Sequence, residues 1–220
     1  MTEVNYLNFD DECWGPKAEK ISIWHFDPTV KDKEEDVFLR VCHFDNDFTE
    51  DVAKAKEQLL TTTSHHLDFW YSLGYKSKLY ATDSTKRLNL KEYPQFKDVV
   101  EKLGLIDHEE YPIRTKLFRQ QPGQILPSHI DNYKTPTGEK TDEMALKAVR
   151  FAVALSDWNV GHYWHFGNAV WQQWKTGECV HWHRTMAHGT ANVGHTERLT
   201  LQITGVPGEK TLELLNNRKW

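Results

Sequence analysis

Residues 150–204 read RFAVALSDWNVGHYWHFGNAVWQQWKTGECVHWHRTMAHGTANVGHTERLTLQIT. Short runs rich in β-branched and aromatic residues alternate here with turns that contain glycine, a pattern typical of strands. The expected strands cover residues 150–155, 163–166, 169–174, 178–183 and 198–204. Many short strands joined by such turns predict a double-sheet barrel or jelly roll.

Helix signals lie in the first half of the chain. Thr49 is expected to cap a helix at 51–60, which has acidic residues at its start. A second helix is expected at 93–103, because Pro94 suits a first turn and Gly104 suits a C-terminal stop. These helices are expected to pack on one side of the β-rich part.

Further strands are expected at 37–44, 114–120 and 125–130, and the polar segment 134–147 is expected to be a loop. That loop could close over a site as a lid, or be an exposed hairpin insertion. The sequence therefore predicts an α+β, mainly β fold with a double-stranded β-helix (jelly-roll) core. We expect a single domain over 1–220, with N-terminal support at 1–112, the jelly-roll core at 113–205 and a C-terminal tail at 206–220.

Composition bounds the class of protein. The chain has 220 residues, of which 39% are hydrophobic and 27% charged, as expected for a soluble globular protein. No apolar run reaches the ~18 residues of a membrane span. The net charge of −5 does not favour nucleic acid as a partner. The acidic N-terminus and three cysteines without a CxxC pattern favour a reducing, cytoplasmic setting, with the oligomeric state left open.

Histidine and tryptophan are unusually frequent, at 12 and 9 residues, and they gather in one region. Six histidines lie between residues 129 and 188, at positions 129, 162, 165, 181, 183 and 188. Five tryptophans lie in the same region, at 158, 164, 171, 174 and 182. Imidazoles crowded among indoles indicate a polar site with aromatic walls, although tryptophans more often pack in cores.

The pair His129 and Asp131 forms an HxD pattern. In a strand, residues i and i+2 point to the same face, so the imidazole and the carboxylate can converge on one point. Together they supply two of the three ligands of the facial triad that binds non-haem Fe(II). A turn histidine with a capping aspartate remains the alternative, since HxD is common by chance.

Arg198 and Thr200 begin an expected strand ten residues after His188. By alternation they share one face, while Leu199, Leu201 and Ile203 share the other. The guanidinium of a buried arginine suits a carboxylate, and a neighbouring hydroxyl adds a hydrogen bond. Such a seat near a two-histidine, one-carboxylate metal is what a dicarboxylate such as 2-oxoglutarate requires. A surface ion pair of Arg198 with Glu197 is the alternative.

His188 has rivals for the second imidazole ligand. His195 lies three residues before Arg198, too near to leave room for a separate strand and a cosubstrate. His181 and His183 form an HxH that could bind zinc, but no third ligand follows at an obvious spacing. His188 is therefore preferred.

The order HxD, H, RxT resembles the Fe(II)/2-oxoglutarate-dependent oxygenases, and is most similar to their aspartyl/asparaginyl β-hydroxylase-like branch. The likeness spans roughly residues 115–205. It is carried by PGQILPSH (122–129), AVRFAVAL (148–155), GNAVWQQWKTGE (167–178) and HWHRTMAHGTANVGHTERLTLQI (181–203). Their order and spacing together are more specific than any single motif.

The resemblance implies that His129 and His188 bind the metal and that Arg198 binds the distal carboxylate of 2-oxoglutarate. It places Arg150 as a second cosubstrate contact, although Arg150 could equally form a structural ion pair. Enzymes of this branch can lack the acidic ligand, whereas this chain has Asp131. That difference brings the chain closer to ordinary two-histidine, one-carboxylate hydroxylases and argues against a halogenase, which needs the carboxylate position vacant.

The implied cofactors are Fe(II), with 2-oxoglutarate and O2 as cosubstrates. The expected reaction hydroxylates an unactivated C–H bond of a small molecule, an amino acid or a peptide side chain, and releases succinate and CO2. The alternative is a non-enzymatic jelly-roll module that binds a sugar or peptide on a tryptophan-rich face.

Overall fold

Two antiparallel sheets form the body of the protein. This computed structural model describes residues 39–60, 82–129, 147–167, 169–183 and 186–216. In the larger sheet, the strand order is β1 (Leu39–His43), β9 (Glu178–His181), β6 (Val149–Ala154), β11 (Arg198–Pro207), β4 (Arg114–Gln120) and β2 (Asp83–Ser84). A further short strand, β3 (Leu105–Ile106), pairs with the end of β11. In the smaller sheet, the strand order is β5 (Ile125–His129), β10 (His188–Asn192), β7 (His162–Phe166) and β8 (Ala169–Trp171).

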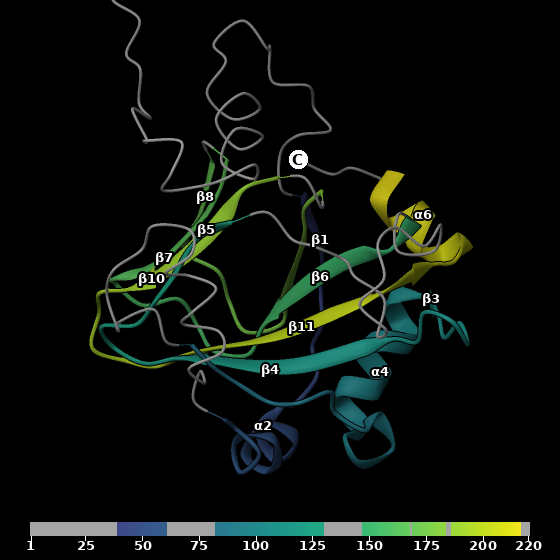
Figure 1. Ribbon diagram of the computed structural model, residues 1–220, viewed down its shortest axis with the longest axis horizontal. Coiled ribbons are helices and arrows are strands. Elements are labelled where there is room, and N and C mark those ends of the chain that lie inside the picture. The colour runs from purple at the N-terminus through teal and green to yellow at the C-terminus, as the bar shows by residue number, and fades with distance from the viewer. Residues whose placement is uncertain (1–38, 61–81, 130–146, 168, 184–185, 217–220) are drawn as a thin grey trace, which may run out of the picture.

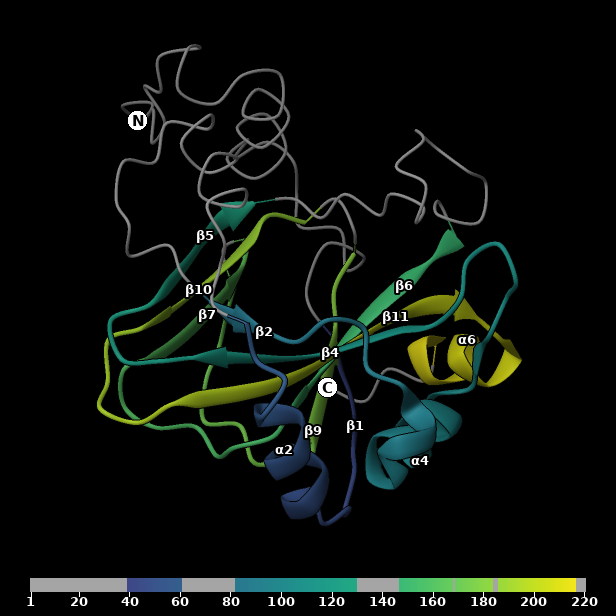
Figure 2. The ribbon, with the colours of Figure 1, turned by 60° about the horizontal axis from the view of Figure 1, so that its bottom comes forward.

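The helices lie on the outer side of the larger sheet, away from the smaller one (Figures 1 and 2). They are α2 (Thr49–Lys56), α4 (Pro94–Leu103) and α6 (Glu209–Asn216), with a 3₁₀ turn, η2 (Leu90–Glu92), before α4. The mainly β architecture with helices on one side is thereby confirmed. Within the described residues, no helix has both the length and the apolar character to cross a membrane.

The larger sheet separates two apolar clusters. Its outer face packs Phe151 and Leu201 against α4 residues such as Phe96 and Leu103, all fully buried. The second cluster lies between the sheets and consists of Ala152, Ala154, Trp164, Phe166, Trp171, Trp174, Val180, Trp182 and Met186. Strand alternation explains the split, since neighbouring residues of β6 and β11 face opposite clusters. The alternate residues of β11, including Arg198 and Thr200, therefore face the space between the sheets.

The first turn of α4 is capped by a residue from another helix. The buried Asp51 of α2 accepts hydrogen bonds at Oδ2 from the backbone N–H groups of Gln95 (2.8 Å) and Phe96 (2.9 Å). At the other end, Gly104 adopts φ 72°, a left-handed conformation that suits glycine at a helix stop. The helix expected at 93–103 is confirmed with its start one residue later, and its first turn is capped by a residue 44 positions away.

We expect Asp51→Ala to lower the free energy of unfolding by about 2 kcal/mol, because it leaves buried N–H groups of α4 without an acceptor. Urea denaturation measures the loss. Asp47→Ala is the matched control, since Asp47 caps α2 through the Thr49 N–H at an exposed site and should matter less. Equal losses in the two variants would contradict the assignment of Asp51 as a cap.

Several elements differ from the expected ones. Thr49 is the first residue of α2 and is itself held by Asp47, so it does not cap that helix. Strand β11 runs to Pro207, and α6 follows where a tail was expected at 206–220. Strand β10 was not expected at all. The expected loop 134–147 lies outside the described residues, except for Lys147.

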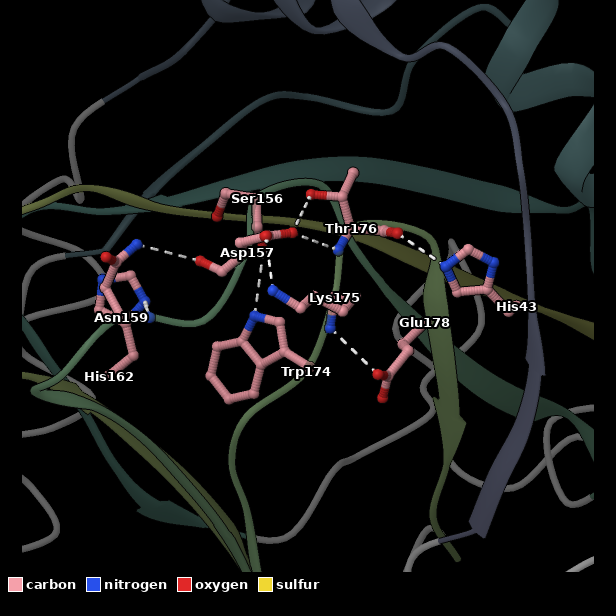
Figure 3. Close-up of polar contacts among 9 residues, drawn as sticks. All are labelled: His43, Ser156, Asp157, Asn159, His162, Trp174, Lys175, Thr176 and Glu178. Atoms are coloured by element: carbon pink, nitrogen blue, oxygen red, sulfur yellow. Dashed lines mark hydrogen bonds and ion pairs between the residues drawn. The ribbon is translucent and has the colours of Figure 1, made fainter.

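Trp171 and Trp174 do not face opposite sides, as a continuous strand would require. Strand β8 ends at Trp171, and Gln173 has φ 56°, so the chain turns and both rings are buried 4.7 Å apart. The Trp174 Nε1–H donates to the Ser156 carbonyl at 3.1 Å (Figure 3). Asp157 accepts from the Thr176 N–H and Oγ1 and from Lys175, which fastens this turn to the end of β6.

Candidate metal centre and anion pocket

His129 and His188 lie directly opposite each other on β5 and β10, which run side by side in the smaller sheet (Figure 2). They are Cα partners, and their ring centroids are 4.4 Å apart. Two imidazoles this close can share one metal ion as ligands. The structure therefore brings together two of the three metal ligands expected from the sequence.

A β-bulge places His129 on the same side as His188. Leu126 pairs with Thr190 and His129 pairs with His188, so three steps on β5 match two steps on β10. The extra residue reverses the alternation, which otherwise would turn His129 to the opposite face from Leu126. Pro127 lies within this bulge, and its missing N–H is tolerated because β5 is an edge strand.

Both imidazoles are oriented by backbone carbonyls. Nδ1 of His129 donates to the Pro127 carbonyl at 2.7 Å, and Nδ1 of His188 donates to the Met186 carbonyl at 3.0 Å. A carbonyl only accepts, so the proton of each neutral ring is on Nδ1 and the lone pair is on Nε2. Metal-binding histidines are held in this way, with the second nitrogen anchored by a hydrogen bond.

Aromatic side chains surround His188, which is 3% exposed. The ring centroids of Trp182 and Phe166 lie 5.0 and 6.1 Å from that of His188. On the next position of β10, a Cβ at Gly189 would come within 2.7 Å of Nε2 of His165, so a larger residue there would displace that ring. The site thus has the aromatic walls expected from the sequence.

The third expected ligand, Asp131, lies outside the described residues. Within the part of the chain that is described, no group of three histidine, cysteine, aspartate or glutamate side chains is placed to hold a metal. The donor set of two oriented imidazoles fits Fe(II), and the sequence supplies a carboxylate two residues after His129. Asp131 as a ligand stays a prediction.

The rival histidines lie elsewhere. His181 Nδ1 donates to the Arg150 carbonyl (2.9 Å), and the His181 ring lies 5.4 Å from that of Phe151, in the larger sheet. Burial lowers the pKa of His181 to about 4, so this ring is neutral at physiological pH. His183 and His195 are exposed. His188 is the candidate that pairs with His129.

Arg198 is a buried cation at the start of β11. It is 4% exposed, and its guanidinium lies over the Trp164 ring, with Cζ 4.8 Å from the ring centroid. Its Nε and Nη1 are buried and meet no hydrogen-bond acceptor among the described residues. Burial lowers the pKa of Arg198 to about 9, which still leaves it charged at neutral pH. A buried charge without a counter-ion is strongly unfavourable, so this position suits an anionic ligand.

Polar residues adjoin Arg198 on the face between the sheets. Gln120 is its Cα partner on β4, and the Gln120 Nε2–H donates to Thr190 Oγ1 (3.0 Å) and to the Thr190 carbonyl (3.3 Å). Thr200 is 4% exposed and follows Arg198 on the same face of β11. The roles of Arg198 and Thr200 in cosubstrate binding stay predictions, and the buried guanidinium supports them.

Arg150 lies at the opposite end of this face. It is the Cα partner of Thr204, six residues after Arg198, or about 20 Å along β11 at ~3.3 Å per residue. Its Nε donates to Thr204 Oγ1 at 3.0 Å, and with the Gln202 amide oriented toward it, the Gln202 oxygen accepts from Nη1 (2.9 Å) and Nε (2.7 Å). Arg150 as a cosubstrate contact stays a prediction.

Cations gather at that end of the face. Lys116 lies beside Arg150, and its pKa is lowered by burial and then by the positive charges of Arg150 and Arg114. These three side chains come from β4 and β6, on either side of β11. This face of the larger sheet therefore carries basic side chains near both ends of β11.

Two neighbours of Arg198 were not expected from the sequence in that role. Gln120 of β4 is the Cα partner of Arg198 on β11. Trp164 belongs to the smaller sheet, and its ring lies under the Arg198 guanidinium. The alternation of β7 gave a weak signal for Trp164, since it places Trp164 and Phe166 on one inward face. Nothing local in the sequence pointed to Gln120.

The sequence profile of the aspartyl/asparaginyl β-hydroxylase family matches residues 43–206, which is more than half of the chain. No curated protein sequence matches this chain. The family match includes His129, His188 and Arg198, and it extends N-terminally beyond the region in which the sequence motifs lie.

Several solved structures are similar to this chain at low sequence identity. The non-heme alpha ketoglutarate dependent epimerase SnoN from nogalamycin biosynthesis is 14% identical with a TM-score of 0.50, and the match covers 78% of each chain. EvdMO1 is 13% identical with a TM-score of 0.46, over 79% of this chain and 48% of that one. A predicted oxalate decarboxylase from Thermotoga maritima is 11% identical with a TM-score of 0.35, over 57% and 81%. The likeness to SnoN supports the double-stranded β-helix assigned from the sequence.

The fold, the paired histidines and the profile match all indicate the same enzyme family. The profile covers strands of both sheets, from the last residue of β1 into β11, and it identifies an enzyme class that depends on iron and 2-oxoglutarate. This chain therefore belongs to the aspartyl/asparaginyl β-hydroxylase family, a group of 2-oxoglutarate- and iron-dependent oxygenases.

Proposed function

We propose that this protein hydroxylates an unactivated C–H bond of a small molecule, an amino acid or a peptide side chain, with succinate and CO2 as co-products. The observation that carries the proposal is the pairing of two oriented imidazoles with a buried arginine. His129 and His188 present Nε2 lone pairs from adjacent strands. Arg198 lies buried between the sheets, and its Nε and Nη1 meet no acceptor in the part of the chain that the structure describes.

One set of residues binds the metal, and another set binds the cosubstrate. His129 and His188 hold Fe(II) through Nε2, and Asp131 supplies the carboxylate ligand. Arg198 and Thr200 hold the distal carboxylate of 2-oxoglutarate by charge and hydrogen bonding. When bound, iron and 2-oxoglutarate together supply the activation of O2 that oxidises a C–H bond.

The aromatic shell keeps water from the reacting centre. Trp182 and Phe166 lie against His188, and both are buried in the cluster between the sheets. Exclusion of water strengthens electrostatic contacts inside the site and limits side reactions. The protein thus contributes position and a dry environment, and acid–base chemistry by a side chain is not required.

The proposal is tested with the full-length chain, Fe(II), 2-oxoglutarate and O2, against a panel of free amino acids, short peptides and small metabolites. We expect at least one compound to stimulate succinate formation and to gain one oxygen atom, seen by mass spectrometry. Since SnoN is described as an epimerase, the product is also checked for inversion without a mass change. Stimulated turnover without oxygen gain would overturn hydroxylation while leaving iron and 2-oxoglutarate dependence intact.

A further inference from the structure

At the contact between Arg198 and Trp164, three buried hydrogen-bond donors have no acceptor among the described residues. They are Nε and Nη1 of Arg198 and Nε1 of Trp164, and each is buried and unpartnered among the described residues. A buried tryptophan normally donates its indole N–H to an acceptor, because a buried N–H that makes no hydrogen bond is unfavourable. The Trp164 donor therefore needs an explanation of the same kind as the Arg198 donors.

The strand register brings these donors to one place. Trp164 is the Cα partner of Thr190 in the smaller sheet, and Arg198 is the Cα partner of Gln120 in the larger one. The Gln120 side chain then links the two sheets, because it donates to Thr190 Oγ1 at 3.0 Å. Arg198 completes the connection by stacking on Trp164.

The Trp164 ring is a firm support for the guanidinium. Its centroid lies 5.3 Å from that of Phe166, 5.4 Å from Trp171 and 5.8 Å from Trp182. A guanidinium 4.8 Å above an indole is within the range of a cation–π contact. The contact fixes the plane of Arg198 without using any of its N–H groups.

We propose that Trp164 is a second binding residue for the distal carboxylate of the cosubstrate: its Nε1–H donates to that carboxylate, and its ring orients Arg198 toward it. The inference rests on the function proposed above. A carboxylate has two oxygens and about four acceptor positions, enough for the indole donor and for two guanidinium donors. This set of donors thus favours a 2-oxo acid with a second, distal carboxylate.

Gln120 does not satisfy these donors. Its Oε1 is also buried and unpartnered among the described residues, and it adjoins Arg198 in the register. A guanidinium has five N–H groups, and a single amide oxygen can occupy only a part of them. Even with a Gln120 contact, Arg198 and Trp164 retain donors that only a further acceptor can meet.

The test compares two 2-oxo acids on the Fe(II)-loaded enzyme under anaerobic conditions. 2-Oxoglutarate carries the distal carboxylate, whereas 2-oxobutyrate can chelate the metal but lacks it. We expect Trp164→Phe, which keeps the ring and removes the N–H, to weaken 2-oxoglutarate binding about tenfold and to leave 2-oxobutyrate binding unchanged. A merely structural role would weaken both acids equally, and that result would overturn the proposal.

Trp171→Phe is the matched control. Trp171 belongs to the same cluster, its Nε1 is also buried and unpartnered among the described residues, and its ring lies against Trp164 and Trp174. It should leave the affinity for both acids at the wild-type value. The same selective loss of 2-oxoglutarate affinity in both variants would refute the special role of Trp164.

A measurement on the wild-type protein covers the case in which Trp164→Phe does not fold. In an anaerobic crystal structure with Fe(II) and 2-oxoglutarate, we expect Trp164 Nε1 within about 3.2 Å of a distal carboxylate oxygen. A separation beyond hydrogen-bond distance overturns this inference alone. If wild-type protein binds neither acid in the presence of Fe(II), the proposed function fails together with it.

Discussion

Replacement of His188 by alanine is expected to abolish stoichiometric iron binding and to lower 2-oxoglutarate turnover at least about a thousandfold. Loss of residues that only orient metal ligands already costs about 10–100-fold in affinity or activity, so loss of a ligand should cost more. His129→Ala should behave in the same way, because the two rings face each other across β5 and β10. Metal content by mass spectrometry and succinate formation measure the two effects.

His195→Ala is the control for these variants. His195 is an exposed imidazole between His188 and Arg198 in the sequence, and we assign it no role. It should keep wild-type iron content and turnover. Iron bound at one equivalent by His188→Ala would contradict the assignment of His188, and the same losses in His195→Ala would do so as well.

Replacement of Arg198 by methionine is expected to separate function from stability. The KM for 2-oxoglutarate should rise about 100-fold, because a charge-assisted contact with the distal carboxylate is lost. The free energy of unfolding without ligand should rise by about 1 kcal/mol, because methionine removes a buried charge that has no counter-ion among the described residues. That gain is net of the lost cation–π contact with Trp164.

Kinetics and urea denaturation on the same preparations decide between the two roles of Arg198. Thr200→Val is the matched change on the same strand, and it should raise the KM by less than Arg198→Met, since it removes one neutral hydroxyl. A large loss of stability in Arg198→Met with an unchanged KM would identify a structural ion pair. The anion pocket would then have to be abandoned.

Much of the fold could be predicted because its signals are local. The alternation at 114–120 matches β4, and Pro94 and Gly104 mark the two ends of α4. Strand β10 was missed because HGTAN contains glycine and asparagine, which are depleted in strands. It forms nevertheless, because it pairs with β5 on one side and β7 on the other.

The sequence predicted only those site residues that belong to a recognisable motif. HxD, His188 and RxT identified the two imidazoles and the arginine, and the family match leaves no support for a non-enzymatic binding module. The bulge that turns His129 inward could not be read from ILPSH, since it depends on the pairing with β10. Gln120 and Trp164 reach Arg198 through contacts between distant strands.

The two tryptophans at 171 and 174 show the limit of periodicity. Alternation holds while a strand continues, so the strand expected over 169–174 would turn residues three apart to opposite faces. The strand ends at Trp171, and the positive φ of Gln173 returns Trp174 to the cluster between the sheets. A non-glycine residue in that conformation is not indicated by local sequence.

An anaerobic titration of the wild-type protein with Fe(II) and 2-oxoglutarate tests most directly whether paired imidazoles and a buried guanidinium assemble one cosubstrate site. We predict a weak visible charge-transfer band that reaches its end point at one equivalent of each per chain. The band should be absent from His129→Ala and Asp131→Ala, and should require far more 2-oxoglutarate in Arg198→Met. Wild-type protein without a band, or a band that persists in His129→Ala, would contradict the account.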